Sequence, residues 1–206
     1  MTMPLTVGGV PVSAATEARL RRQLAELERW NGVINLVAKS TLADAWDRHI
    51  ADSAQLLRLA PETPVHWADL GSGAGFPGLV VAIILAERSP ETRVTLVESD
   101  RRKATFLRES VRGLGLTTTV LAERIETIAP LCADVVSARA LARLEKLLPL
   151  TVRHIAPDGI ALFLKGAAAQ SELAMVSGAW SFSLERLPSQ TDPTSEILRL
   201  KDLIHV

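Results

Sequence analysis

The fold of this chain is decided by residues 66–79, which read His-Trp-Ala-Asp-Leu-Gly-Ser-Gly-Ala-Gly-Phe-Pro-Gly-Leu. The apolar run 65–70 has the length of a buried strand, and residues 79–85 are apolar enough to be a helix interior. The glycines between them permit positive φ and let a ligand lie against the backbone. Pro77 suits the first turn of a helix, where its missing N–H would be unpaired anyway. The stretch predicts a strand, a tight turn and a helix whose N-terminus faces a nucleotide or nucleoside.

The spacing of these glycines fits two kinds of nucleotide site. Residues 73–78 satisfy G-x-G-x-x-G with Glu98 twenty residues beyond, which is the pattern of a dinucleotide-binding turn. Residues 69–75 equally match the D-x-G-x-G-x-G turn of S-adenosylmethionine enzymes. The residues concerned are Asp69, Gly71, Gly73, Gly75 and Gly78. The glycines alone leave both interpretations open.

Composition predicts a soluble cytoplasmic protein of ordinary domain size. The chain has 206 residues, 48% of them hydrophobic, and its formal net charge is zero. The single cysteine, Cys132, excludes a disulfide framework. Residues 1–12 lack the basic start and apolar core of a leader, and no run is long enough to span a bilayer.

The beginning of the chain is predicted to be helical. Residues 13–30 carry apolar side chains at helical spacing, with Ser13 or Thr16 as the cap, and residues 41–59 continue this pattern after a break. We therefore expect residues 1–64 to form a helical extension packed on the core.

Strand and helix patterns alternate through residues 65–206. We expect further strands at 93–97, 117–121, 133–138 and 159–164, and helices after Ser99 or Asp100 and at 143–155. Two final strand-like runs, 180–187 and 195–203, have no helix between them. This order predicts an α/β fold with a mostly parallel sheet, helices on both faces and a closing antiparallel strand pair.

In such a sheet the ligand lies beyond the carboxyl ends of the strands. The glycine turn, Glu98 and the residues after the strand at 133–138 should therefore surround one crevice. Glu98 is suited to accept hydrogen bonds from ribose hydroxyls, and a helix cap is its structural alternative. The basic cluster Arg101, Arg102 and Lys103 could bind phosphate or form a solvated helix face.

Several motifs occur in a fixed order between Leu24 and Gly166. They are Trp30-Asn31, Asn35-Leu36, Arg48-His49-Ile50, Asp52-Ser53, residues 69–78, Glu98-Ser99, Phe106-Leu107, Ala138-Arg139-Ala140, Leu144 and Leu164-Lys165-Gly166. Together they resemble the ribosomal RNA small-subunit methyltransferase G family, also called glucose-inhibited division protein B. The resemblance implies a Rossmann-like class I methyltransferase that uses S-adenosyl-L-methionine. Its expected target is guanine N7 in the decoding-region loop of 16S ribosomal RNA, at nucleotide 527.

The resemblance also implies roles for individual residues. The cofactor would be bound by Asp69, Gly71, Gly73, Gly75, Phe76, Glu98, Ile125, Glu126 and Arg139, with Glu98 on the ribose and Ile125 and Glu126 beside the adenine. The RNA would be contacted by Arg101, Arg102, Lys103 and Lys165. Two departures are Glu98, where the family often has Asp, and Arg102-Lys103, where it often has lysine before arginine.

The residues permit N7 methylation better than other base methylations. Residues 137–140 read Ser-Ala-Arg-Ala, without the proline and aromatic of the segment that usually holds an exocyclic amine. Cys132 precedes an apolar strand and is not expected to be a nucleophile. N7 needs positioning but no general base, so Arg139 is expected to position the reactants. His49 and Asp52 are expected to brace the extension against the sheet, and no metal is implied.

Two other functions remain open at this point. One is an NAD(P)-dependent oxidoreductase that uses the G-x-G-x-x-G turn, and the other is a non-catalytic module that binds RNA or the ribosome. For the enzyme, the expected partner is 16S ribosomal RNA or the small ribosomal subunit. The chain is expected to act as a monomer away from membranes.

Overall fold

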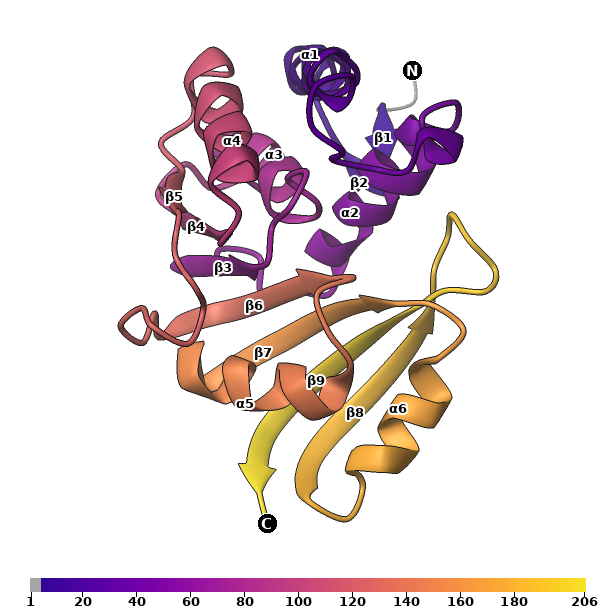
Figure 1. The fold of residues 1–206 in the computed structure, drawn as a ribbon, viewed down its shortest axis with the longest axis vertical. Helices are drawn as coiled ribbons and strands as arrows, with labels where there is room; N and C mark the ends of the chain where they lie inside the picture. Colours follow the sequence, from indigo (N-terminus) through magenta and orange to yellow (C-terminus); the bar gives the residue numbers. More distant parts are fainter. Residues whose placement is uncertain (1–4) are drawn as a thin grey trace.

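The computed structural model of the chain describes residues 5–206. Its centre is a seven-stranded sheet with the order β5-β4-β3-β6-β7-β9-β8 (Figure 1). The strands are β3 (His66–Leu70), β4 (Arg93–Val97), β5 (Thr119–Leu121), β6 (Ala133–Arg139), β7 (Ile155–Lys165), β8 (Trp180–Pro188) and β9 (Glu196–His205). The pairs β7–β9 and β9–β8 are antiparallel, and the other neighbouring strands of this sheet are parallel. The predicted fold class and the closing antiparallel pair are confirmed.

Helices cover both faces of this sheet. They are α3 (Gly78–Arg88), α4 (Arg101–Gly113), α5 (Leu144–His154) and α6 (Ala169–Val176). Figure 1 shows α3 and α4 above the sheet and α5 and α6 below it. Alternate strand residues supply the two cores, since Trp67 packs with the upper helices and Phe163 with the lower ones. The helix α6 was not predicted, because only three of its eight residues are buried and its apolar period is short.

The strand order reverses between β3 and β6. Their register pairs Asp69 with Ser137, while β4 lies on the other side of β3 and pairs Leu96 with Asp69. The glycine turn after β3 and the residues after β6 therefore flank the switch point, where ligands of open α/β sheets bind.

The start of the described chain is a short hairpin followed by a capped helix. Strands β1 (Thr6–Val7) and β2 (Val10–Pro11) pair with each other, and two-residue strands carry no period that a sequence could show. The helix α1 (Ala14–Asn31) begins after Ser13, whose side chain accepts a hydrogen bond from the Thr16 N–H. Of the two predicted caps, Ser13 is the correct one.

The single helix predicted over residues 41–59 is wrong. The structure has a short 3₁₀ turn η1 (Lys39–Thr41), a π-helical turn η2 (Trp46–Ala51), one turn α2 (Asp52–Ala54) and a further 3₁₀ turn η3 (Gln55–Arg58). The Asp52 N–H donates to the carbonyl of Asp47, five residues back, and the Ser53 hydroxyl donates to the His49 carbonyl at 2.5 Å. Side-chain bonds to the backbone compete with a regular helix here.

Residues 5–64 share an apolar core with the sheet. Leu20, Leu27 and Ile50 are fully buried in the cluster that contains the α3 side chains Ile83 and Ile84. Residues 1–4 of the predicted extension lie outside the described residues. The division of the chain at residue 64 stays a prediction.

Candidate functional site

The glycine turn (residues 71–78) has the backbone that its sequence predicts. Gly71, Gly73 and Gly75 have φ of 69°, 54° and 88°, which side chains with a Cβ rarely adopt. The N–H groups of Gly71 and Ser72 donate to the Val97 carbonyl at 2.9 and 3.0 Å, so the turn is pinned to the end of β4.

Asp69 shapes this turn from beneath. Its carboxylate accepts hydrogen bonds from the Ser137 hydroxyl at 2.7 Å and from the Gly78 N–H at 3.2 Å. The side chain is fully buried, and this burial raises the pKa of Asp69 to about 6. Asp69 and Gly75 were expected to bind the cofactor directly, but neither lines the two cavities at this end of the sheet. A Cβ on Gly75 would instead lie 2.9 Å from the Cβ of Leu79 in α3, so that glycine allows the turn to pack on the helix.

Glu98 lies at the carboxyl end of β4, opposite the turn. One carboxylate oxygen accepts from the Gly73 N–H at 2.8 Å and the other from the Asp100 N–H at 2.7 Å. The cap of α4 is Asp100, which accepts from the N–H groups of Arg102 and Lys103. Glu98 is therefore not the helix cap, and its carboxylate is fixed beside the turn.

Two cavities meet at the switch point. The turn cavity, of about 750 Å³, contains most of the predicted cofactor residues. These residues are Gly71, Gly73, Phe76, Glu98, Ile125, Glu126 and Arg139. The outer cavity, of about 540 Å³, lies between the loop after β6, the turns of residues 41–52 and the loop between β8 and β9. Arg139 and residues 140–142 line both cavities, so this short segment separates them.

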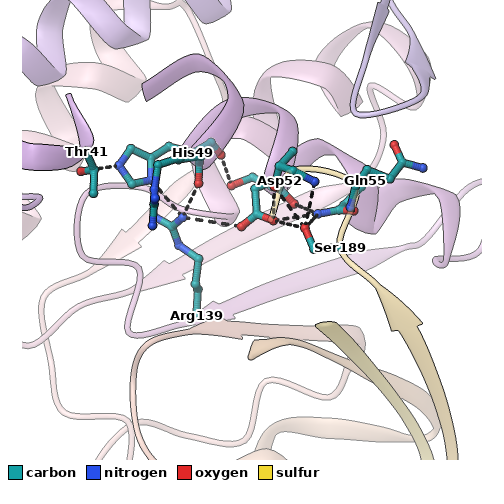
Figure 2. A network of polar contacts seen from close by, with 10 residues as sticks. Thr41, His49, Asp52, Gln55, Arg139 and Ser189 are labelled. Carbon is teal, nitrogen blue, oxygen red and sulfur yellow. Dashed lines mark hydrogen bonds and ion pairs between the residues drawn. The ribbon is translucent and has the colours of Figure 1, made fainter. Parts of the chain in front are cut away.

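Arg139 links the sheet to the beginning of the chain. Figure 2 shows its guanidinium between His49 and Asp52. The Nη1 group donates to the Arg48 carbonyl at 3.1 Å and to His49 Nδ1 at 3.0 Å, and it lies 3.8 Å from Asp52 Oδ2. The guanidinium carbon also lies 5.0 Å from the centre of the Phe76 ring.

These contacts fix the protonation of His49. An arginine can only donate, so Nδ1 accepts and Nε2 carries the hydrogen that it shares with Thr41 Oγ1 at 3.1 Å. Burial and the charge of Arg139 lower the pKa of His49 to about 4. The ring also stacks on Phe76 with a centroid distance of 4.9 Å. The expected bracing role is confirmed, although the partner of His49 is Arg139 and not Asp52.

The predicted RNA residues are not equivalent. Arg101 and Arg102 are exposed at the start of α4, and Lys103 lines the turn cavity. Lys165, which was expected to contact RNA, lines the outer cavity, and its ammonium donates to Glu172 and to the Ala142 carbonyl, both at 2.8 Å. That ammonium therefore fixes the loop after β6 to α6. Because α6 was not predicted, its Glu172 could not be foreseen as the partner.

Sequence reasoning missed several residues of the two cavities. Arg124 and Lys146 line the turn cavity, and Thr191, Asp192 and Ser195 line the outer one. The position of Arg124 beside Ile125, after β5, was a usable signal. The residues of the β8–β9 loop carried none, because they are distant in sequence from every motif.

Other kinds of site find no support in residues 5–206. Within this range no group of His, Cys, Asp or Glu side chains could hold a metal ion. The part of the chain that the structure describes also contains no helix with the length and hydrophobicity of a bilayer span. Cys132 is exposed and lines neither cavity.

Comparison with known proteins shows which family this chain is similar to. A family model described as rRNA small subunit methyltransferase G matches residues 16–196. The chain is 52% identical to the "Ribosomal RNA small subunit methyltransferase G" of Cereibacter sphaeroides, over 95% of each chain. It is also 52% identical to the protein of that name from Rhodospirillum centenum, over 93% of this chain and 87% of that one.

Solved structures confirm the fold class. A SAM-dependent methyltransferase from Aquifex aeolicus superposes with a TM-score of 0.61 at 13% identity, over 88% of this chain and 98% of that one. TYW2 from M. jannaschii, solved in complex with AdoMet, gives a TM-score of 0.55 at 14% identity, over 77% and 76%. At these identities the likeness concerns the fold alone.

Proposed function

The chain belongs to the rRNA small subunit methyltransferase G family, and we propose that it transfers a methyl group to guanine N7 in the decoding-region loop of 16S ribosomal RNA. Its cofactor is S-adenosyl-L-methionine, and its substrate is small-subunit ribosomal RNA. The oxidoreductase alternative is not favoured.

The turn cavity fits this cofactor. A Cβ on Gly73 would meet no atom closer than the Gly71 carbonyl at 3.8 Å, so the space beside this glycine is left for a ligand. We assign Glu98 to the ribose hydroxyls, because its carboxylate is the acceptor fixed at the cavity wall. Ile125 and Glu126 lie on the same wall and would flank the adenine. When bound, the cofactor supplies an electrophilic methyl group on a positively charged sulfur.

The outer cavity is the proposed place of the target base. Guanine N7 has an in-plane lone pair and no proton, so the protein needs to orient the base but not to remove a proton. This requirement agrees with His49, whose Nδ1 already accepts from Arg139 and whose pKa of about 4 makes it a weak base. Arg139, on the boundary between the cavities, would orient the base. That position is the single observation that carries the proposal.

The proposal is tested on the product RNA. After methylation with tritiated cofactor, 16S RNA is reduced with borohydride and treated with aniline, which cuts at N7-methylguanosine. We expect one cut in the decoding-region loop. Tritium in the RNA without this cut would leave a methyltransferase that acts on another atom.

We propose that the chain acts as a monomer in the cytoplasm, on 16S RNA or on the small subunit. The exposed pair Arg101 and Arg102 lies beside the turn cavity and would bind RNA phosphate. Lys103, which lines that cavity, would lie closer to the cofactor.

A further inference from the structure

We propose that Asp52 and Arg139 together read the N1–H and O6 edge of the target guanine, so that Asp52 is a specificity residue of the outer cavity. This inference rests on the proposed function and adds a residue to its site. Three observations support it. Among the described residues, only one oxygen of the Asp52 carboxylate accepts hydrogen bonds, the other lies beside Arg139, and Arg139 lies between the outer cavity and the turn cavity.

The two oxygens of Asp52 are used very differently. Oδ1 accepts from Gln55 Nε2 at 2.8 Å and from the hydroxyls of Ser189 and Thr191, both at 3.0 Å. Within residues 5–206 no group donates a hydrogen bond to Oδ2, whose nearest charged partner is Arg139 Nη1 at 3.8 Å. Asp52 lines the outer cavity although only 9% of the residue is exposed. One oxygen thus anchors the carboxylate, and the other remains available at the cavity wall.

Oδ2 is an acceptor beside the guanidinium of Arg139. The two Nη1 hydrogens of this guanidinium are used by the Arg48 carbonyl and His49 Nδ1, whereas its Nη2 and Nε groups have no hydrogen-bond acceptor within residues 5–206 and form the donor of the pair. Guanine offers the matching pair, because its O6 accepts and the adjacent N1–H donates. Adenine offers the reverse pair, with a donating amine at C6 and an accepting N1. The same two protein groups therefore favour guanine and would face unpaired groups on adenine.

The order of the groups also points N7 in the required direction. Asp52 lines only the outer cavity, Arg139 lines both, and Gly71 and Gly73 line only the turn cavity. Around guanine, N1, O6 and N7 follow one another in the same sequence. A base held at N1 by Asp52 and at O6 by Arg139 would turn N7 toward the turn cavity.

Both side chains are held in place before any ligand binds. Asp52 is fixed by three donors from η3 and from the loop between β8 and β9. Arg139 is fixed by the Arg48 carbonyl and by His49. Recognition by preorganised groups loses little side-chain entropy on binding.

The test measures nucleotide binding, so it does not depend on methyl transfer. Guanosine monophosphate and adenosine monophosphate are titrated by NMR into the protein saturated with S-adenosylhomocysteine, which keeps either nucleotide out of the turn cavity. We expect the wild type to prefer the guanine nucleotide by at least about tenfold. It should bind 7-deazaguanosine monophosphate equally well and 1-methylguanosine monophosphate about tenfold more weakly.

The decisive variant is Asp52→Asn, whose amide can donate to adenine N1. We expect it to lower the guanine-to-adenine preference by about tenfold. The matched control is Ser189→Ala, which removes one partner of Oδ1 and leaves Oδ2 unchanged. A purely structural role of Asp52 predicts the same loss of preference in both variants, whereas our proposal predicts it in Asp52→Asn alone.

Each contrary outcome overturns the proposal. Equal binding of the two nucleotides by the wild type, no binding of the guanine nucleotide, or an unchanged preference in Asp52→Asn would exclude base reading by Asp52. If the variant does not fold, tight binding of 1-methylguanosine monophosphate by the wild type would exclude it instead. Cleavage of wild-type-methylated 16S RNA by borohydride and aniline is scored separately, so N7 methylation can stand while this inference fails.

Discussion

The glycine turn and the bracing segment (residues 46–58) lie at the same site but are held together in different ways. The turn is held by carboxylates that accept hydrogen bonds from its backbone. Asp69 accepts from the Gly78 N–H, and Glu98 accepts from the Gly73 N–H. The bracing segment is held by hydrogen bonds to side chains that are distant in sequence, such as the bond from the Ser189 hydroxyl to the Asp52 carboxylate. The turn is therefore held mainly by residues 69–98 of one strand–helix–strand unit, whereas the bracing segment depends on contacts with the more distant Arg139 and Ser189.

The largest effect should come from removing the carboxylate under the turn. Asp69→Ala leaves the Gly78 N–H and the Ser137 hydroxyl without their acceptor in a fully buried place. At roughly 1–3 kcal/mol for each unpaired group, we expect a loss of about 2–6 kcal/mol in unfolding free energy, measured by urea denaturation. In the bracing segment Ser189→Ala should lose only about 1 kcal/mol, because Asp52 keeps two other donors. Equal losses would remove the distinction between the two regions.

The two regions should also respond to pH in opposite directions. The pKa of Asp69 is raised to about 6, so its contribution to stability is complete below pH 3.8 and is lost as the pH rises through 6. The pKa of His49 is lowered to about 4, so its contribution is complete above pH 6.5 and is lost as the pH falls through 4. We expect roughly 3 kcal/mol from Asp69. Since solvent reaches part of the His49 ring, its share should be nearer 1–2 kcal/mol.

Single variants separate these two contributions. In wild type they partly offset each other between pH 4 and 6. Asp69→Asn should leave the His49 dependence, so the urea midpoint falls as the pH is lowered. His49→Gln should leave only the pH dependence that is due to Asp69, so its urea midpoint rises as the pH is lowered. Parallel pH profiles in the two variants would contradict this assignment.

Cofactor binding by the turn can be tested apart from its stability. Gly73→Val places a side chain at φ 54° in the open space of the turn cavity, so we expect cofactor affinity to fall by about 2–3 kcal/mol. The matched control is Gly115→Val, which has φ of 64° and no neighbour within 4 Å. It introduces the same backbone strain outside both cavities. Calorimetry should show normal cofactor binding in the control alone.

How far the sequence predicts each region follows from the distances between the interacting residues. The strand β3 was predicted to within one residue, and the predicted helix interior 79–85 lies within α3, because apolar period and glycine spacing are local signals. Pro77 is the N-cap of α3 and not a residue of its first turn. The bracing segment was predicted as one regular helix, because Ser189 and Arg139, which hold it, are remote in sequence. Its shape arises from contacts that no local pattern encodes.

The candidate site shows the same division. Motifs identified Gly73, Glu98 and Arg139 correctly as neighbours of the cavities. Motifs could not distinguish residues that line a cavity from residues that support its wall. Asp69 was therefore expected to contact the cofactor, whereas its carboxylate accepts hydrogen bonds from the Gly78 N–H and the Ser137 hydroxyl. The contact of Lys165 with Glu172 could not be predicted for a related reason, since Glu172 lies on the unpredicted helix α6.

A smaller effect is expected when Glu98 is shortened. Glu98→Ala removes the acceptor of the Gly73 and Asp100 N–H groups together with the proposed ribose contact. We expect cofactor binding to weaken by roughly 1–3 kcal/mol in calorimetry. Glu98→Gln keeps one acceptor oxygen and should lose less. Unchanged affinity in Glu98→Ala would refute the ribose assignment.

The smallest effect should come from the exposed arginines beside the turn, and it should appear in the salt dependence more than in the affinity itself. Arg101→Glu with Arg102→Glu removes two exposed cations next to the turn cavity. Each lost phosphate contact lowers the slope of log K for RNA against log salt by about 0.7, so we expect a change of about 1.4 with unaltered cofactor affinity. The matched control is Arg88→Glu with Arg93→Glu, which changes the charge equally at the other end of α3 and the start of β4. That end of the sheet lies away from both cavities. The control variant should therefore keep the wild-type slope of log K for RNA against log salt. Equal slope changes in the two double variants would show that RNA senses only the net charge of the protein, and the proposed RNA contact at α4 would be wrong.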